Sequence, residues 1–431
     1  MEILLTILYC LLFIFLIYKL DFFDINGVAR KYLVGVFLLK IAAGIIMYVI
    51  YTRYYTDRST ADIFKYFDDS KVMYDTLWHH PIDFFKMLTG IGNNSPYFDL
   101  YYKQMNHWYR VFESNIYNDS HTIIRINALI RIFSFGYFNV HTVFMCFISF
   151  TGLVALYKFF AVYLADKKRE LFVAVFLLPS ILFWGSGVLK ESILLFGMGM
   201  LLYHLDSLAR EKFSFFRLFW LLFSMMLLIY TKYYIFIILI PLLISFLWCK
   251  FTNERYCLIK YIVVIALYIF AGLHIQWVFP AYNLLEIISQ KQNDFIGLAK
   301  EMHSGSLLTQ QLLHPELIPV LKEIPVAFYN TLFRPYIFEP NSLLMLFSAI
   351  ENLILILFMI LCLVFPLRKI PHKPVLYLCL FFFVGTFTLT GLISPVMGAI
   401  VRYKVPAMPF MVIFFIMMLN TRKIEGIFRK K

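Results

Sequence analysis

Long, uninterrupted apolar runs are the feature of this sequence that most limits what it can fold into. An early run reads KYLVGVFLLKIAAGIIMYVIY (31–51), and runs of similar length recur throughout the chain. A stretch of about 18 or more apolar residues can cross a bilayer as a helix. Charged residues make up 15% of the chain, whereas soluble domains carry about 25%. The sequence therefore predicts an all-α, polytopic membrane protein.

The spacing of these runs predicts about eleven membrane-spanning helices. We expect them at 3–19, 34–52, 138–162, 171–187, 190–204, 216–231, 233–249, 259–278, 344–366, 374–392 and 404–420. The whole chain, 1–431, is interpreted as one transmembrane domain with two long loops, 53–137 and 279–343. Both loops are rich in aromatic and amphipathic stretches, which favours short helices lying along the membrane surface.

The basic residues indicate how the chain is oriented rather than a nucleic-acid partner. The net charge is +13, and a basic balance can signal nucleic-acid binding. Here, however, the lysines and arginines gather in every second gap between apolar runs, as in Lys167 to Arg169 and in the C-terminal tail. Such gaps face the cytoplasm. We therefore expect the N-terminus and both long loops outside and the C-terminus inside.

The stretch ADIFKYFDDSKVMYD (61–75) follows an apolar run and carries several carboxylates. In a helix, Asp62, Tyr66 and Asp69 would share one face. Asp68 would lie on the neighbouring face. Like charges on one face repel each other, so structural economy alone does not favour this pattern.

Three readings of these carboxylates remain open. They could form a solvated helix face in which Lys65 and Lys71 are local partners. One of them could instead act as a general base at the membrane surface, removing a proton from an acceptor hydroxyl or amine. A divalent metal such as Mg²⁺ or Mn²⁺ is a third possibility, but a DxD triplet is missing, so no metal or other cofactor is expected.

Cations also occur in the short turns that should face outward. FWGSGVLKESILLF contains Lys190 and Glu191, LLIYTKYYIFI contains Lys232, and ISPVMGAIVRYKVPAMPFM contains Arg402 and Lys404. Cations are disfavoured in short outer loops. They could have local roles, for example Lys190 pairing with Glu191, or a lone lysine reaching the headgroups. Together they could instead form a cationic floor that binds a lipid-linked phosphate.

The second long loop ends in another charged segment, FYNTLFRPYIFEPNSLL. Arg334 and Glu339 each precede a proline there. They could pair with each other to fix the loop, or Arg334 could bind a phosphate or an acceptor.

In order and spacing, these features resemble the GT-C class of integral membrane glycosyltransferases. The resemblance is greatest to the branch of protein O-mannosyltransferases and lipid A aminoarabinose transferases. It covers roughly 34–420 and rests on Asp62 to Phe67 after a span and on four further stretches, TIIRINALIRIF, LLPSILFWGSGVLKESILLFGMGMLLY, YTKYYIFIILIPLL and VRYKVPAMPFMVIFF. The chain departs from the family in having an additional span before the acidic loop and in its crowded acidic position.

The resemblance implies a function and its participants. The donor would be a sugar on a polyprenyl phosphate or diphosphate, and the acceptor a glycan, lipid or protein at the outer face of a prokaryotic cytoplasmic membrane. Asp62 would be the general base, with Asp68 and Asp69 as alternatives. The groups that would bind substrate or steady the departing phosphate are Tyr66, Lys190, Glu191, Lys232, Arg334, Arg402 and Lys404. Such an enzyme would serve polysaccharide biosynthesis in the cell envelope.

Other functions fit the same pattern. A surface-polysaccharide polymerase or ligase of the O-antigen type would share the lipid-phosphate site but join two lipid-linked glycans. A transporter or flippase would bind substrate near the bilayer midplane, where Lys40 is the main ionisable residue. A scaffold without catalysis is the remaining alternative.

Overall fold

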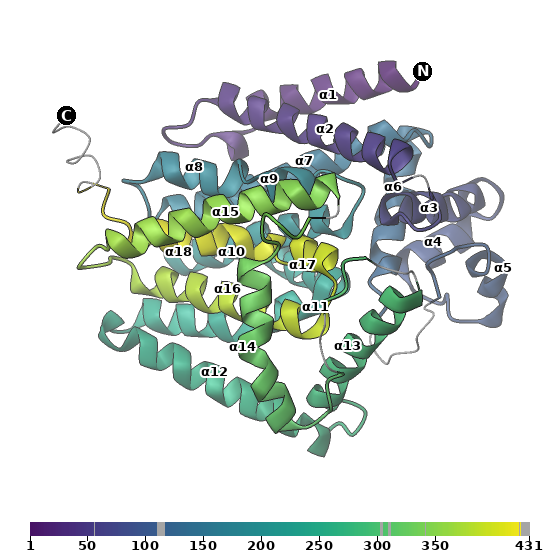
Figure 1. Ribbon diagram of the computed structural model, residues 1–431. Helices are drawn as coiled ribbons and strands as arrows, with labels where there is room; N and C mark the ends of the chain where they lie inside the picture. The colour runs from purple at the N-terminus through teal and green to yellow at the C-terminus, as the bar shows by residue number, and fades with distance from the viewer. Residues whose placement is uncertain are drawn as a thin grey trace. The chain divides into compact units, whose positions relative to one another are not determined.

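The computed structural model describes residues 1–55, 57–109, 117–301, 305–308, 312–340, 342–421 and 423. In this part of the chain the regular elements are helices (Figure 1). Nine segments are long and apolar enough to cross a membrane. They are α1 (Glu2–Lys19), α2 (Arg30–Arg53), α7 (Phe138–Ala161), α10 (Lys190–Arg210), α11 (Phe215–Phe251), α12 (Cys257–His274) with its flanking turns, α15 (Leu343–Val364), α16 (Lys373–Ile393), and α17 (Met397–Tyr403) together with α18 (Met408–Met418). The predicted all-helical architecture is confirmed for the described residues, and the apolar helices support a membrane protein. Its orientation stays a prediction.

Two places account for the difference between nine candidate spans and the eleven predicted. The expected helix 171–187 is divided into α8 (Lys168–Phe176) and α9 (Pro179–Trp184). The nine residues of α8 extend only about 14 Å, so neither short helix crosses a bilayer alone. The expected helices 216–231 and 233–249 are the two halves of α11, which leaves helical geometry at Lys232 with φ −148° and ψ 79°.

The chain forms two compact units, each described here by itself. Unit 1 comprises Met1–Val162, Val175–Leu177 and Ile181–Tyr233, and unit 2 comprises Tyr163–Ala174, Leu178–Ser180 and Tyr234–Lys431.

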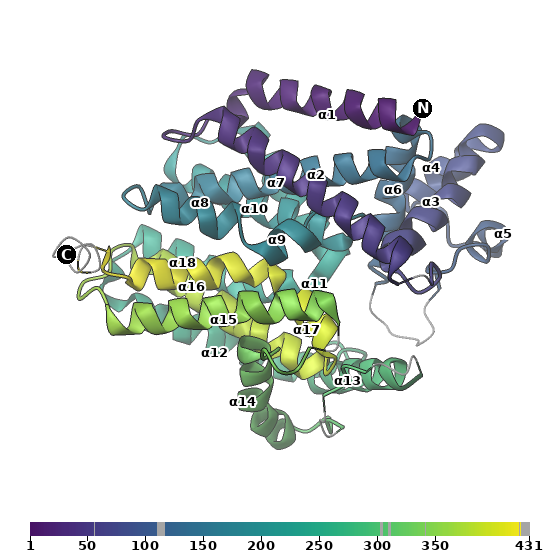
Figure 2. The ribbon, with the colours of Figure 1, turned by 45° about the horizontal axis from the view of Figure 1, so that its top comes forward.

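In unit 1, the spanning helices are organised around α7. Helices α1, α2 and α10 all pack against it, and α1 and α2 run beside it in both ribbon views (Figure 2). The contact with α10 is close enough to require glycine on both sides. A Cβ on Gly199 of α10 would overlap the carbonyl oxygen of Gly152 in α7.

The first long loop forms a small helical layer within unit 1. It contains α3 (Asp62–His79), α4 (Pro81–Thr89), α5 (Asp99–Tyr102) and α6 (Ser120–Ser134). Helix α3 packs on α4 and α6. Their shared core is built of buried aromatic, methionine and branched side chains, including Tyr66, Met73, Phe84, Trp108 and Ile123. The amphipathic helices expected in 53–137 are therefore present, and their position along the membrane surface stays a prediction.

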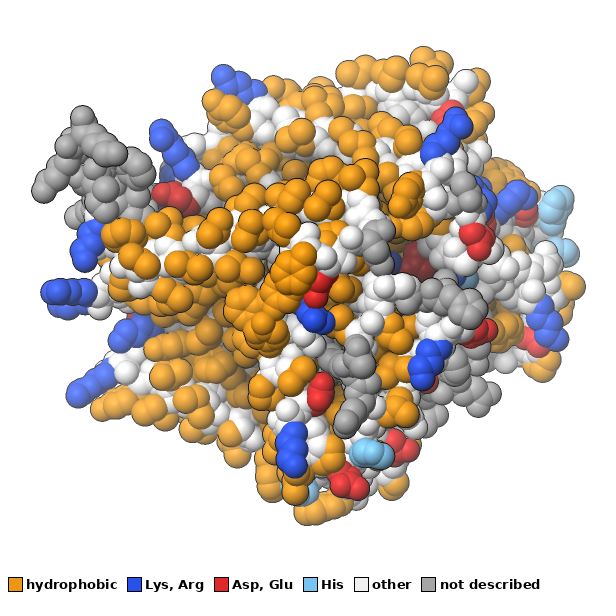
Figure 3. Space-filling view, viewed as in Figure 1, with side chains coloured by type: hydrophobic (Ala, Val, Ile, Leu, Met, Phe, Trp, Pro, Cys, Tyr) orange, Lys and Arg blue, Asp and Glu red, His pale blue; other side chains and the backbone are white. Residues whose placement is uncertain are grey.

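Unit 2 is built around α16, which packs against α14 (Leu317–Phe333), α18 and α13 (Leu284–Glu301). The outer side of α15 is strongly apolar. Leu353, Ile354, Leu357, Ile360 and Leu363 are all exposed, and hydrophobic side chains cover α15 in the space-filling view (Figure 3). Such a surface is expected of a helix in contact with lipid tails.

Candidate functional site

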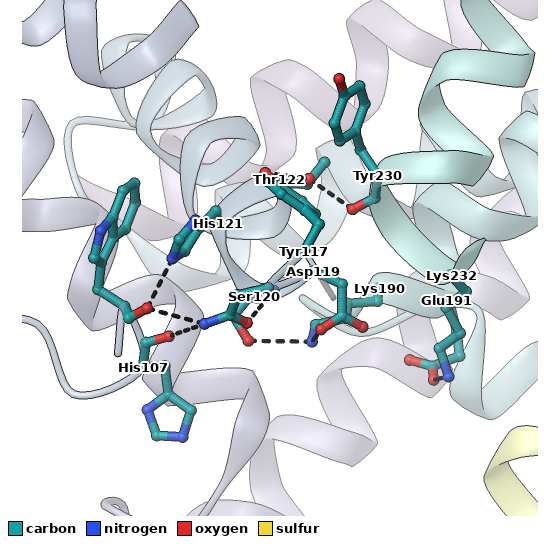
Figure 4. A network of polar contacts seen from close by, with 12 residues as sticks. His107, Tyr117, Asp119, Ser120, His121, Thr122, Lys190, Glu191, Tyr230 and Lys232 are labelled. Carbon is teal, nitrogen blue, oxygen red and sulfur yellow. Dashed lines mark hydrogen bonds and ion pairs between the residues drawn. The ribbon is translucent and has the colours of Figure 1, made fainter. Parts of the chain in front are cut away.

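Lys190 is a buried cation at the start of a long helix. Helix α10 begins at this residue, directly after Leu189 in extended conformation. The Lys190 side chain is 9% exposed, and its Nζ lies 2.9 Å from Asp119 Oδ1. The ammonium also donates to Ser120 Oγ at 3.2 Å (Figure 4). Because a buried charge is costly unless it is paired, the carboxylate of Asp119 explains how the ammonium is tolerated here.

The Lys190 ammonium also lies 5.0 Å from the centroid of the Tyr66 ring. Tyr66 belongs to α3, one turn after Asp62, and residues four apart share a helix face. The charge of Asp62 acts on both Lys190 and His107, and the His107 ring meets Tyr66 edge-on at 6.2 Å between centroids. We name Asp62, Tyr66, His107, Asp119, Ser120 and Lys190 the Lys190 cluster. It lies entirely in unit 1.

His107 is neutral at physiological pH. Burial lowers the pKa of His107 to about 4; the cations Lys65 and Lys190 act in the same direction, and Asp62 opposes them. The Nδ1 atom of His107 is buried and has no hydrogen-bond partner among the described residues. The cluster therefore combines two carboxylates and an ammonium with an uncharged imidazole.

Asp69 holds the loop that carries His107. Its side chain accepts the backbone N–H groups of Asn106 and His107, each at 2.8 Å. Asp69 is 2% exposed. Burial raises the pKa of Asp69, and the two backbone N–H groups oppose that rise. Both of its oxygens are occupied by the backbone, so the geometry gives this predicted catalytic candidate a structural role.

The next residue after His107 anchors the same loop. The Trp108 ring is stacked between Tyr102 at 4.1 Å and His121 at 3.8 Å. The His121 ring also bonds through Nε2 to the carbonyl oxygen of Trp108 at 2.7 Å. Because Trp108 follows His107 and His121 follows Ser120, this stack holds the His107 loop against the Asp119–Ser120 segment.

Asp68, another predicted candidate, is part of an exposed ion pair. Arg58 donates to both of its carboxylate oxygens, at 2.8 and 2.6 Å, and the Asp68 side chain is 39% exposed. Asp75 pairs with Lys71. The solvated-face reading therefore describes these two residues, whereas Asp69 is buried and Asp62 is half-buried.

Glu191 and Lys232 form a separate buried ion pair. Lys232 Nζ lies 3.1 Å from Glu191 Oε1, and their side chains are 5% and 0% exposed. The local pairing of Lys190 with Glu191, one of the alternatives left open, does not occur, because each has a partner from another segment. The pair ties the first turn of α10 to the break in α11. Nearby, Thr122 Oγ1 donates to the Tyr230 carbonyl at 2.7 Å (Figure 4).

The remaining predicted residues belong to unit 2. Lys404 is buried and donates to the carbonyls of Thr331 and Arg334 and to Asn352 Oδ1. The first two carbonyls are at the end of α14, where helical partners run out. The pairing of Arg334 with Glu339, one of the two roles left open for Arg334, is present, with Arg334 Nε 3.1 Å from Glu339 Oε1. Arg402 is half-buried in α17.

Some buried polar residues escaped the sequence analysis. Asp119 and Ser120 lie in NDSHT, where α6 begins at Ser120. Asp or Ser before an amphipathic run is a helix-start signal. That signal does not identify a lysine partner far away in the chain. Glu351 sits in the apolar helix α15 and accepts the backbone N–H and the hydroxyl of Ser180 at 3.1 and 3.0 Å. A single carboxylate in such a long apolar run was the available signal.

Among the described residues, no three His, Cys, Asp or Glu side chains come together as they would around a metal ion. Comparison with protein families, curated proteins and solved structures found no match for this chain.

Proposed function

We propose that this chain is a membrane glycosyltransferase that moves a sugar from a polyprenyl-phosphate carrier to an acceptor. The observation that carries the proposal is the buried ammonium of Lys190, which lies over the Tyr66 ring of the acidic helix α3. Lys190 is the first residue of α10. Asp62 is the first residue of α3 and precedes Tyr66 by one helical turn. Glycosyl transfer from a phosphate needs a base for the acceptor and a cation for the leaving group.

The position of the cluster suits a lipid-borne donor. Candidate span α2 ends at Arg53, shortly before Asp62, and α10 begins at Lys190. The start of a third candidate span, α7, meets α3 through Phe138, whose ring lies 5.1 Å from that of Phe67. The cluster thus lies where several apolar helices end, which is the depth at which a lipid carries its phosphate.

In the proposed step, one bond to the anomeric carbon of the sugar forms and another breaks. The acceptor hydroxyl gives its proton to the Asp62 carboxylate as its oxygen bonds to the anomeric carbon of the sugar. The bond from that carbon to the phosphate oxygen breaks, and its electron pair leaves with the phosphate. Lys190 uses two of its three N–H donors on Asp119 and Ser120. The third is available to a phosphate oxygen, and such a preorganised cation stabilises charge as it develops.

We propose Asp62 as the base because it precedes Tyr66 by one helical turn, and the Tyr66 ring faces the Lys190 ammonium. Asp69 is occupied by two backbone N–H groups, and Asp68 by Arg58.

The test is cleavage of a defined donor in proteoliposomes. The purified chain is reconstituted with polyprenyl phosphate carrying a radiolabelled glucose, mannose or N-acetylglucosamine, together with extracted envelope glycan as acceptor. Release of polyprenyl phosphate and labelling of the glycan are both measured. Asp62→Asn should lower both by about 10²–10⁴-fold, and Lys190→Met by about 10²–10³-fold.

Asp68→Asn is the matched control, since it removes a carboxylate from the same helix outside the cluster; it should retain wild-type rates. Full activity in Asp62→Asn would overturn the assignment of the base. Movement of the intact donor across the bilayer, without cleavage by any variant or by wild type, would overturn the proposal in favour of transport. Joining of whole lipid-linked glycans, instead of single sugars, would make the chain a polymerase or ligase.

A further inference from the structure

Lys40 is a buried charge that the proposed reaction does not use. It lies in the middle of α2, and its side chain is fully buried. Its Nζ donates to the carbonyl oxygen of Gly185 at 2.9 Å. Charged groups within membrane-spanning helices are costly and rarely lack a role. The role of Lys40 must therefore be sought in the segment that it contacts.

That segment is the turn Gly185–Leu189, which links α9 to α10. Other side chains hold its carbonyls as well. Ser192 Oγ lies 3.2 Å from the Gly185 oxygen and 3.0 Å from the Gly187 oxygen. The thiol of Cys146 is 3.3 Å from the Ser186 oxygen. The carbonyls of Gly185, Ser186 and Gly187 lie outside any helix, and they accept hydrogen bonds from side chains of α2, α7 and α10.

The turn is also closely packed between α2 and α3. A Cβ on Gly44 of α2 would come within 2.6 Å of the Ser186 carbonyl oxygen, and one on Gly187 would overlap the sulfur of Met47. On the other side, Val188 and Leu189 belong to the same apolar cluster as residues of α3. The turn ends at the residue before Lys190, so any shift of the turn is passed directly to the first turn of α10.

We propose that Lys40 is a positioning residue that acts through the Gly185 carbonyl on the turn Gly185–Leu189 and so sets the place of Lys190. The claim about position concerns unit 1 alone and is independent of the reaction. Its kinetic consequence rests on the proposed function.

The position of Lys190 can be measured without any substrate. The folded chain in nanodiscs is treated with an amine-reactive ester, and labelling of each lysine is followed by peptide mass spectrometry. In wild type, Lys190 should be protected, because it is buried and paired with Asp119. Loss of a hydrogen bond to a charged group should raise local opening, and hence Lys190 labelling, by about 10- to 100-fold in Lys40→Met.

Two further variants make the result specific. Lys158→Met is the control, since it removes a half-buried lysine of α7 that lies over Phe22 and not on the turn. It should leave Lys190 protected. Ser192→Ala removes the other donor near Gly185 by a small change, and it should raise Lys190 labelling in the same direction. If Lys190 stays protected in both Lys40→Met and Ser192→Ala, the proposal is overturned.

The rate of donor cleavage then tests whether the position of Lys190 affects catalysis. In the donor-cleavage assay, Lys40→Met should lower kcat by about 10²-fold, the scale expected of a misplacement near 1 Å, while KM for the donor stays close to that of wild type. A general loss of folded protein would instead lower activity without changing the kcat of the folded fraction, and would contradict the kinetic claim. If wild type cleaves no donor, the proposed function fails, but labelling still decides the role of Lys40.

Discussion

Replacing Asp69 by Asn separates a structural carboxylate from a catalytic one on the same helix. In the folded chain Asp69 accepts two backbone N–H groups at 2.8 Å. Hydrogen bonds to charged groups contribute about 1.5–3 kcal/mol each. Asn keeps one acceptor oxygen and presents an NH₂ group to the second N–H, so one bond is lost and the other weakened. The Asn side chain is neutral, which relieves part of the desolvation that raises the pKa of Asp69.

The net expected loss in the free energy of unfolding is therefore about 2 kcal/mol, at the lower end of the range for these bonds. For a unit of this size that corresponds to a fall in Tm of about 4–8 °C. Thermal unfolding followed by tryptophan fluorescence in detergent measures it, because Trp108 adjoins the loop that Asp69 holds. Asp68→Asn, which removes an exposed ion pair, should shift Tm very little.

The structural role of Asp69 also predicts the catalytic rate of the Asp69→Asn variant. Asp69→Asn should retain donor cleavage in the fraction that stays folded. An Asp69→Asn protein with unchanged Tm and no donor cleavage would refute the division of roles and move the general base from Asp62 to Asp69.

Three other predictions follow from the packing and charges of unit 1. Gly199→Ala should destabilise the protein severely, because its Cβ would overlap the Gly152 carbonyl and backbone cannot move aside; thermal unfolding tests it, and a wild-type Tm would contradict it. Glu191→Gln should cost about 3–5 kcal/mol, because it removes the carboxylate that faces the buried Lys232 ammonium. The double change Glu191→Leu with Lys232→Met should cost far less; equal losses would contradict the pairing. Because the pKa of His107 is lowered from 6.5 to about 4, the unfolded chain binds more protons in that window. The free energy of unfolding should therefore be highest above pH 6.5 and fall as the pH is lowered toward 4. His107→Gln should reduce this dependence of Tm on pH between 4 and 6.5.

The membrane class and most helices could be predicted because they depend on local properties. Apolar run length predicts a span without knowledge of any partner, and the spacing of Asp62 and Tyr66 places them on one face once α3 is a helix. The break at Lys232 was also visible, as a polar residue between two apolar runs. The division of 171–187 was not predicted, although Pro179 is a recognised boundary signal, because the apolar run continues on both sides of it.

The pairing of charges could not be predicted from local pattern. Lys190 is adjacent to Glu191 in the sequence, yet its partner is Asp119, and Glu191 pairs with Lys232. These contacts join the residue just before α6 to α10, and α10 to α11, and only the packing of the unit brings them together. The same holds for Lys40, whose contact with Gly185 joins α2 to a turn far away in the chain.

The measurement that tests the central claim most directly is a structure of the chain in nanodiscs with polyprenyl phosphate added. We predict that the phosphate lies within about 3 Å of Lys190 Nζ, as a charge-assisted hydrogen bond requires, with its apolar chain running along the spanning helices and Asp62 on the side where the sugar would be. A phosphate bound away from Lys190, with the ammonium still paired only to Asp119 and Ser120, would contradict the account.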